Sequence, residues 1–123
     1  MQAFVWISLG AVAGANLRYL LSTLLARVTT EFPLGTLAIN VTGSFLLGFF
    51  MAWTTERVLA DPRWRLLIAV GFCGGYTTFS SYAFETMAYF EQGQWPLLWA
   101  NILGNNLLSL AGALGGIALA RVL

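Results

Sequence analysis

The stretch Gly74-Gly75-Tyr76-Thr77-Thr78-Phe79-Ser80-Ser81-Tyr82 lies inside an apolar block that runs from residue 64 to residue 90. Two glycines followed by β-branched and hydroxyl residues weaken an α-helix. In hydrocarbon, loosened backbone is tolerated only where it is buried in protein or lines a cavity. The sequence therefore predicts a helix that is broken near Gly75, in the middle of a membrane span.

Three further apolar blocks accompany this one, at residues 3–26, 33–53 and 95–122. Each is near or above the ~20 residues that a helix needs to cross hydrocarbon. Hydrophobic residues make up 59% of the chain and charged residues only 9%, far from the balance of a soluble domain. We therefore expect an all-α integral membrane protein, with residues 1–123 forming a single transmembrane domain of four helices, the third of which is broken.

Charge and cysteine content exclude several classes of function. The net charge is +1 and there is no lysine, so no basic surface is available for nucleic acid. Cys73 is the only cysteine, which excludes an intrachain disulfide and favours a small buried apolar residue. Glu85 is the only acid inside a block and histidine is absent, so we expect Glu85 to pair or to reach the interface rather than to relay protons.

Polar residues inside the blocks form two stripes with a spacing of four residues. The stripes are Thr36, Asn40 and Ser44 in the second block, and Asn101, Asn105 and Ser109 in the fourth. Such side chains should face the protein interior or a water-filled passage. Their uncharged amide and hydroxyl donors suit an anion that must bind and then leave. The alternative is that they form interhelical hydrogen bonds that only hold the bundle together.

Aromatic and cationic residues add to this picture. Phe79 and Tyr82 lie three residues apart, and their ring edges carry partial positive charge that can line the route of an anion. They can equally fill the core. Arg18, near the end of the first block, either anchors the helix at the interface or draws anions towards a vestibule.

Two patterns concern assembly and orientation. Four helices enclose little beyond their own side chains, so we expect an oligomer. Small residues at close-packing spacing predict tight helix contacts, within or between subunits; they are Gly10 with Gly14, Gly71 with Gly75, and Gly112 with Gly116. More arginines lie on the side of the termini than on the side of Arg27, which favours cytoplasmic termini.

Three pieces of the sequence carry a resemblance to a known family. They are Gly14-Ala-Asn-Leu-Arg18-Tyr19, Pro33-Leu-Gly-Thr-Leu-Ala-Ile-Asn40-Val-Thr-Gly43-Ser44, and Gly71-Phe-Cys-Gly-Gly-Tyr-Thr-Thr-Phe-Ser80. With the chain length and the four blocks, they resemble the bacterial fluoride channels known as Fluc or CrcB over nearly the whole sequence. The resemblance implies passive export of fluoride across the bacterial inner membrane, and no enzymatic activity.

The resemblance also implies how the protein assembles. Two antiparallel copies form a homodimer with two fluoride routes, and a structural sodium ion lies on the symmetry axis. Main-chain carbonyls at the positions of Gly74 and Thr77, given by both copies, hold the sodium. We give this arrangement precedence over the arginine asymmetry, because the arginine count is small.

Individual pathway residues follow from the resemblance. Asn40 matches the pathway asparagine, Phe79 the first of two pore phenylalanines, and Arg18 the arginine of the first helix. Tyr82 takes the place of the second pore phenylalanine. A family tyrosine and two serines correspond to Asn101, Asn105 and Ser109, of which only Ser109 matches closely. The predicted fluoride pathway therefore contains Arg18, Asn40, Thr78, Phe79, Ser81, Tyr82, Asn105 and Ser109.

Two other functions are compatible with this size and composition. A small proton-coupled multidrug exporter would need a glutamate in its first helix, where this chain has Arg18 and no acid before Glu31. A membrane packing subunit without transport activity is supported by the glycine pairs.

Overall fold

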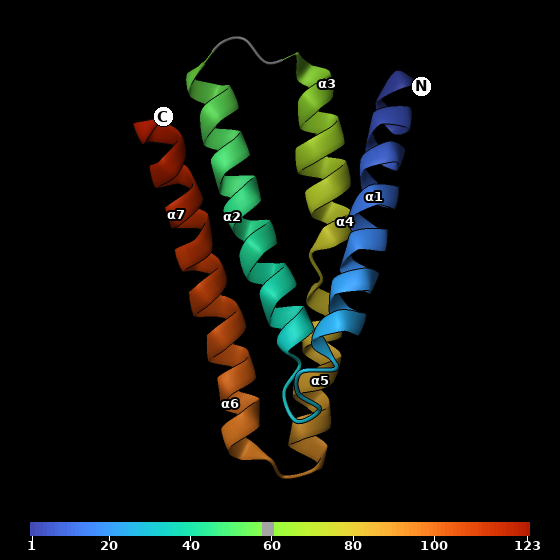
Figure 1. Cartoon of the computed structure of the whole chain (residues 1–123), viewed down its shortest axis with the longest axis vertical. Coiled ribbons are helices and arrows are strands. Elements are labelled where there is room, and N and C mark those ends of the chain that lie inside the picture. The colour runs from blue at the N-terminus through green and yellow to red at the C-terminus, as the bar shows by residue number, and fades with distance from the viewer. Residues whose placement is uncertain (58–60) are drawn as a thin grey trace.

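The computed structural model describes residues 1–57 and 61–123, and in them every regular element is helical (Figure 1). The helices form four elongated segments, which we call rods. The first two rods are the single helices α1 (Gln2–Leu25) and α2 (Leu34–Glu56). The third rod contains α3 (Pro62–Trp64), the π-helix η1 (Arg65–Cys73), α4 (Gly74–Tyr76) and, after a break, α5 (Phe79–Glu91). The fourth runs without interruption through α6 (Trp95–Leu103), the π-helix η2 (Gly104–Leu108) and α7 (Ser109–Val122).

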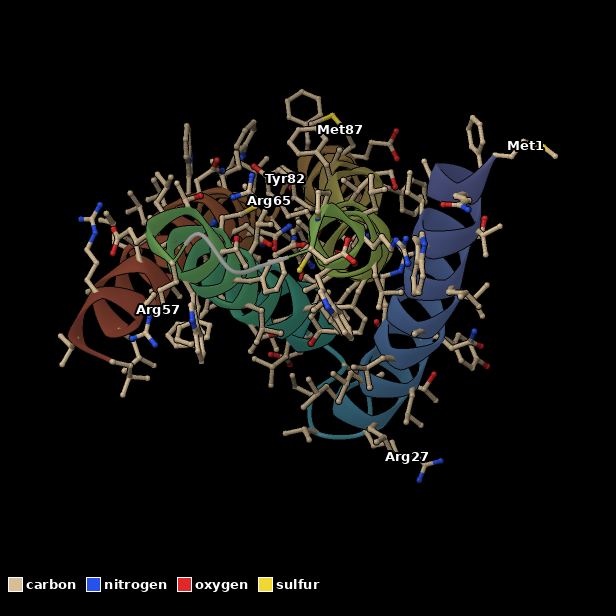
Figure 2. The ribbon with its side chains drawn as sticks, turned by 90° about the horizontal axis from the view of Figure 1, so that it is seen from above. Met1, Arg27, Arg57, Arg65, Tyr82 and Met87 are labelled. Atoms are coloured by element: carbon tan, nitrogen blue, oxygen red, sulfur yellow. The ribbon has the colours of Figure 1, made fainter. Side chains whose placement is uncertain are left out.

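The outer surface is apolar. Among the described residues, α1, α2 and the helix at Trp95–Val122 are long and apolar enough to cross a membrane. Large side chains such as Phe4, Phe84 and Leu114 are between 68% and 78% exposed, and side chains stand out all around the ribbons (Figure 2). A surface of this kind requires lipid or another protein as its neighbour. The chain is an integral, multi-pass membrane protein.

Glycines bring the helix backbones into direct contact. A Cβ atom added at Gly14 would collide with the backbone of Phe72, and one added at Gly116 would collide with the backbone of Phe45. Equivalent contacts join α1 to the third rod and α7 to α2, made by Gly10, Gly71, Gly75 and Gly112. All the glycine pairs of the sequence therefore pack within one chain.

Both termini lie at the same end of the bundle (Figure 1). At that end Arg121 Nε lies 3.0 Å from Glu56 Oε1, joining α7 to α2. Arg65 donates to the Thr55 hydroxyl at 3.1 Å. Arg27 follows α1 at the opposite end, and its side chain projects away from the ribbon (Figure 2). These charged residues lie at the two ends of the bundle.

The helix break lies at Thr77 and Thr78, two to three residues beyond Gly75, near which the sequence predicts it. Gly74 is helical, with φ −64 and ψ −37, and Gly75 packs closely on the backbone of Ala11. The chain becomes extended at Thr77 (ψ 158) and Thr78 (φ −147, ψ 121). The glycines therefore serve close packing, and contacts with α2 place the break.

Candidate functional site

Asn40 of α2 stabilises the break by pairing with the backbone of Thr78. Its Oδ1 accepts from the Thr78 N–H at 2.9 Å, and its Nδ2 donates to the Thr78 carbonyl at 3.0 Å. An asparagine amide offers both a donor and an acceptor, so it can replace the helical partners of one residue. Asn40 thereby satisfies backbone groups that would be costly to leave unpaired in hydrocarbon.

At the break, two backbone carbonyl groups lose the N–H donors that they would have in a continuous helix. In a continuous helix the N–H of residue 78 would donate to the Gly74 carbonyl, but here it donates to Asn40. The N–H of Ser81 would donate to the Thr77 carbonyl, but it donates to the Thr78 hydroxyl at 3.2 Å. The carbonyls of Gly74 and Thr77 therefore lack their usual partners.

Three asparagines form a continuous ladder from the break into the fourth rod. Asn40 Nδ2 donates to Asn105 Oδ1 at 2.9 Å. Asn105 Nδ2 donates to the Asn101 carbonyl and to Asn101 Oδ1, at 3.0 and 2.9 Å. Asn101 Nδ2 then donates to the Thr86 hydroxyl at 3.0 Å. We call Asn40, Asn105 and Asn101 the asparagine ladder; it joins the two predicted stripes by direct hydrogen bonds.

A central cavity of about 320 Å³ lies beside the break. It is lined by Asn40, Gly43, Ser44, Leu47, Thr77, Thr78, Phe79, Tyr82, Asn105, Asn106, Ser109 and Leu110. None of these residues carries a formal charge. The buried Ser109 Oγ has no hydrogen-bond partner among the described residues. Six of the eight predicted pathway residues are thus brought together around one uncharged cavity.

Two aromatic rings line this cavity. The ring centroids of Phe79 and Tyr82 are 5.3 Å apart, with an angle of 64° between the ring planes. The Phe79 side chain is 77% exposed. The Tyr82 hydroxyl accepts from Asn106 Nδ2 at 3.1 Å. Asn106 was not among the predicted site residues; the signal that points to it is that a tyrosine hydroxyl inside a span needs a polar partner.

A second cavity, of about 1050 Å³, lies between the α1–α2 loop and α5. Its lining includes Ser81, which the sequence assigned to the pathway, and Glu85. Glu85 Oε1 accepts from the Thr36 hydroxyl at 2.7 Å, while the buried Oε2 has no partner among the described residues. The Tyr89 hydroxyl donates to the Glu31 carbonyl at 2.6 Å and ties the loop to α5. One carboxylate oxygen of Glu85 is thus hydrogen-bonded inside the protein, and the other is not.

The central cavity shares part of its lining with an apolar groove. Ser44 and Leu47 line both this cavity and an apolar groove of about 440 Å³ along α2 and α7. That groove reaches Glu56 and Arg121 at the end where the termini lie. Arg18 is partly exposed on α1 and lines neither this groove nor the two cavities.

Comparison with known proteins places these features in a family. The family model described as "CrcB-like protein, Camphor Resistance (CrcB)" matches residues 5–117. The chain belongs to the CrcB family. The family resemblance found in the sequence is thereby confirmed.

Relatives of this CrcB chain match it nearly end to end. One from Koribacter versatilis is 59% identical over 122 residues, covering 98% of this chain and 97% of the relative. One from a Sulfurihydrogenibium species is 45% identical over 124 residues, covering both chains completely. One from Solibacter usitatus is 44% identical over 119 residues, covering 96% and 98%. Each of the three is named "Fluoride-specific ion channel FluC".

Proposed function

We propose that this protein is a passive, fluoride-selective ion channel. The observation that carries the proposal is an uncharged cavity, lined by hydroxyls, amides and two aromatic rings, at a helix break inside the third rod. Uncharged donors can replace the water of an anion without holding it permanently. The names of the full-length relatives support fluoride as the ion.

The proposed route uses the spaces described above. Fluoride enters the cavity beside Ser81, passes Phe79 and Tyr82 in the central cavity, and leaves along the groove between α2 and α7. Export needs no coupled reaction, because an inside-negative potential drives an anion outward by about 2.3 kcal/mol per 100 mV. The expected location is the bacterial inner membrane, with four crossings per chain.

A structural sodium ion fits the donor set at the break. The Gly74 and Thr77 carbonyls lack helical donors, and unwound backbone carbonyls coordinate sodium in other membrane proteins. Gly74 is exposed, and no atom lies within 4 Å of the position that a Cβ atom would take there. A bound cation would offset the charge of an anion where the dielectric is low.

The proposed assembly is an antiparallel homodimer. One chain leaves Phe79 and Gly74 exposed at the break, so a second copy there would enclose the site and add a second pair of carbonyls. The glycine pairs do not compete for this surface, because they pack inside one chain. An antiparallel pair also places equal numbers of arginines on each side of the membrane.

The test is ion flux from liposomes that contain the purified protein. Fluoride efflux is expected to exceed chloride efflux strongly, and empty liposomes provide the baseline. Equal rates for the two anions, or no efflux, would contradict the proposal. A packing subunit would instead show weakened assembly without any change in ion flux when Asn40 is replaced.

A further inference from the structure

The amide N–H groups around the central cavity are already engaged. Asn40 Nδ2 donates to the Thr78 carbonyl and to Asn105, and Asn105 Nδ2 makes two bonds to Asn101. Asn106 Nδ2 donates to the Ile102 carbonyl at 2.8 Å and to Tyr82. Carbonyl oxygens only accept, so these contacts fix which end of each amide is the nitrogen. The three amides therefore have no N–H left for an anion.

Three hydroxyl groups around the same cavity remain free to donate. The Tyr82 oxygen accepts from Asn106, and no acceptor for its own hydrogen occurs among the described residues. The Ser109 hydroxyl is buried without any partner there. The Thr77 hydroxyl, by contrast, donates to the Cys73 carbonyl at 2.9 Å. The Ser44 hydroxyl also lines the cavity and makes no hydrogen bond among the described residues. The free hydroxyl donors in the cavity are thus Ser44, Tyr82 and Ser109.

We propose that the Tyr82 O–H donates a hydrogen bond to the anion in the central cavity and that Asn106 positions it. This inference rests on the proposed fluoride function. By donating to the Tyr82 oxygen, Asn106 occupies one lone pair and leaves the hydroxyl hydrogen for another acceptor. An amide donor on that oxygen also polarises the hydroxyl, which strengthens its own donation.

The chemistry favours a small anion that accepts hydrogen bonds strongly. A ring edge alone offers weak C–H donors, whereas an O–H bonded to an ion forms one of the stronger hydrogen bonds in proteins. The position that the family resemblance assigns to a phenylalanine thus gains a true donor here. Asn106 acts only through Tyr82, so it is a positioning residue.

The experiment compares fluoride efflux from liposomes for Tyr82→Phe, Asn106→Leu and the double variant. Loss of a hydrogen bond to an ion corresponds to about tenfold or more in an equilibrium constant, so we expect Tyr82→Phe to lower fluoride efflux about tenfold. Asn106→Leu should lower it severalfold. The double variant should be no slower than Tyr82→Phe, because Asn106 acts through the missing hydroxyl.

Tyr76→Phe is the matched control. Tyr76 also pairs its hydroxyl with one side chain, that of Thr42 at 2.9 Å, but it does not line the central cavity. We expect its fluoride efflux to stay within about twofold of the parent protein, because the loss of a neutral hydrogen bond outside the lining of the central cavity has a small effect.

The outcomes separate this inference from the proposed function. Parent protein without fluoride efflux would overturn both. If the parent protein conducts fluoride and Tyr82→Phe conducts it equally well, the inference that the Tyr82 hydroxyl donates to the anion is overturned, and the proposed function stands. If the double variant loses efflux by the product of the single effects, Asn106 does not act through Tyr82. Should Tyr82→Phe fail to fold, Asn106→Leu retains the ring, and unchanged efflux in that variant would overturn the inference.

Discussion

Asn105 supports two neighbours with one side chain. Its oxygen accepts from Asn40, which stabilises the break, and its nitrogen donates to Asn101. Asn105 is 5% exposed and Asn101 is fully buried, so little water reaches these bonds. The side chain therefore connects the helix break to the fourth rod.

We predict that Asn105→Leu lowers the stability of the protein. The change leaves a donor of Asn40 and an acceptor of Asn101 unpaired, and each buried unpaired group costs about 1–3 kcal/mol. Thermal unfolding in detergent measures the effect. Asn106→Leu is the control: that side chain is exposed, and its loss should shift the melting temperature far less. Equal melting temperatures for both variants would show that the asparagine ladder contributes nothing to stability.

Helices in this protein meet backbone to backbone, and the two glycines at positions 115 and 116 show how narrow the tolerance is. A Cβ atom at Gly116 would collide with the Phe45 backbone, whereas one at Gly115 would make ordinary contact with the Phe45 ring at 3.8 Å. A side chain is therefore tolerated at Gly115 but not at Gly116, although the two residues are adjacent in α7.

Gly116→Ala is expected to destabilise the packing of α7 on α2. Forcing a methyl group into a filled contact costs about 1–3 kcal/mol. Gly115→Ala should be neutral or slightly stabilising, because alanine favours helix by about 1 kcal/mol over glycine. Thermal unfolding followed by size-exclusion chromatography compares the two. If both variants melt at the same temperature as the parent protein, Gly116 does not make the close contact with the Phe45 backbone.

The helices were predictable from composition, but the break and its contacts were only partly so. The predicted spans 33–53 and 95–122 correspond to α2 and to the helix at Trp95–Val122. Local propensity pointed to Gly75, but the break lies further along, because Asn40 binds the backbone of Thr78. Asn106 was not predicted, because the four-residue spacing of the stripe in the fourth block includes Asn105 and passes over the residue next to it. A contact between distant segments leaves no local pattern.

At the scale of the whole molecule, one chain leaves its candidate site at the surface. Phe79 and Gly74 are both exposed beside the break, although a route for an ion must be closed off from lipid. The exposed residues and the two carbonyls that lack their helical donors would both suit a protein neighbour at this surface. A second copy of the chain meets both needs in the proposed dimer.

Gly74→Leu tests that dimer directly. Gly74 has helical backbone angles and an empty surrounding, so the single chain should accept leucine. A bulky side chain at the proposed contact should shift the protein to monomers, counted by single-molecule photobleaching in liposomes. Ala3→Leu, at an exposed residue of α1, is the control and should remain dimeric. Dimers that persist in Gly74→Leu would place the interface elsewhere.

Sodium removal tests the proposed ion site. A ligand at 100 times its Kd stabilises the folded state by about 2.7 kcal/mol, so replacing sodium with N-methylglucamine should lower the melting temperature. Fluoride efflux should fall with it, and added sodium should restore both. Potassium at the same ionic strength serves as the control. A protein that melts and conducts identically in all three salts has no structural sodium.

The break also has a consequence for how the chain is made. The α5 segment, Phe79–Glu91, contains Ser80, Ser81 and Glu85 within thirteen residues, so it partitions poorly into lipid unaided. Asn40 has already left the ribosome when Thr78 emerges, whereas Asn105 follows later. We therefore expect the third rod to settle in the bilayer only after the fourth has been synthesised, which makes its insertion a late event of biogenesis.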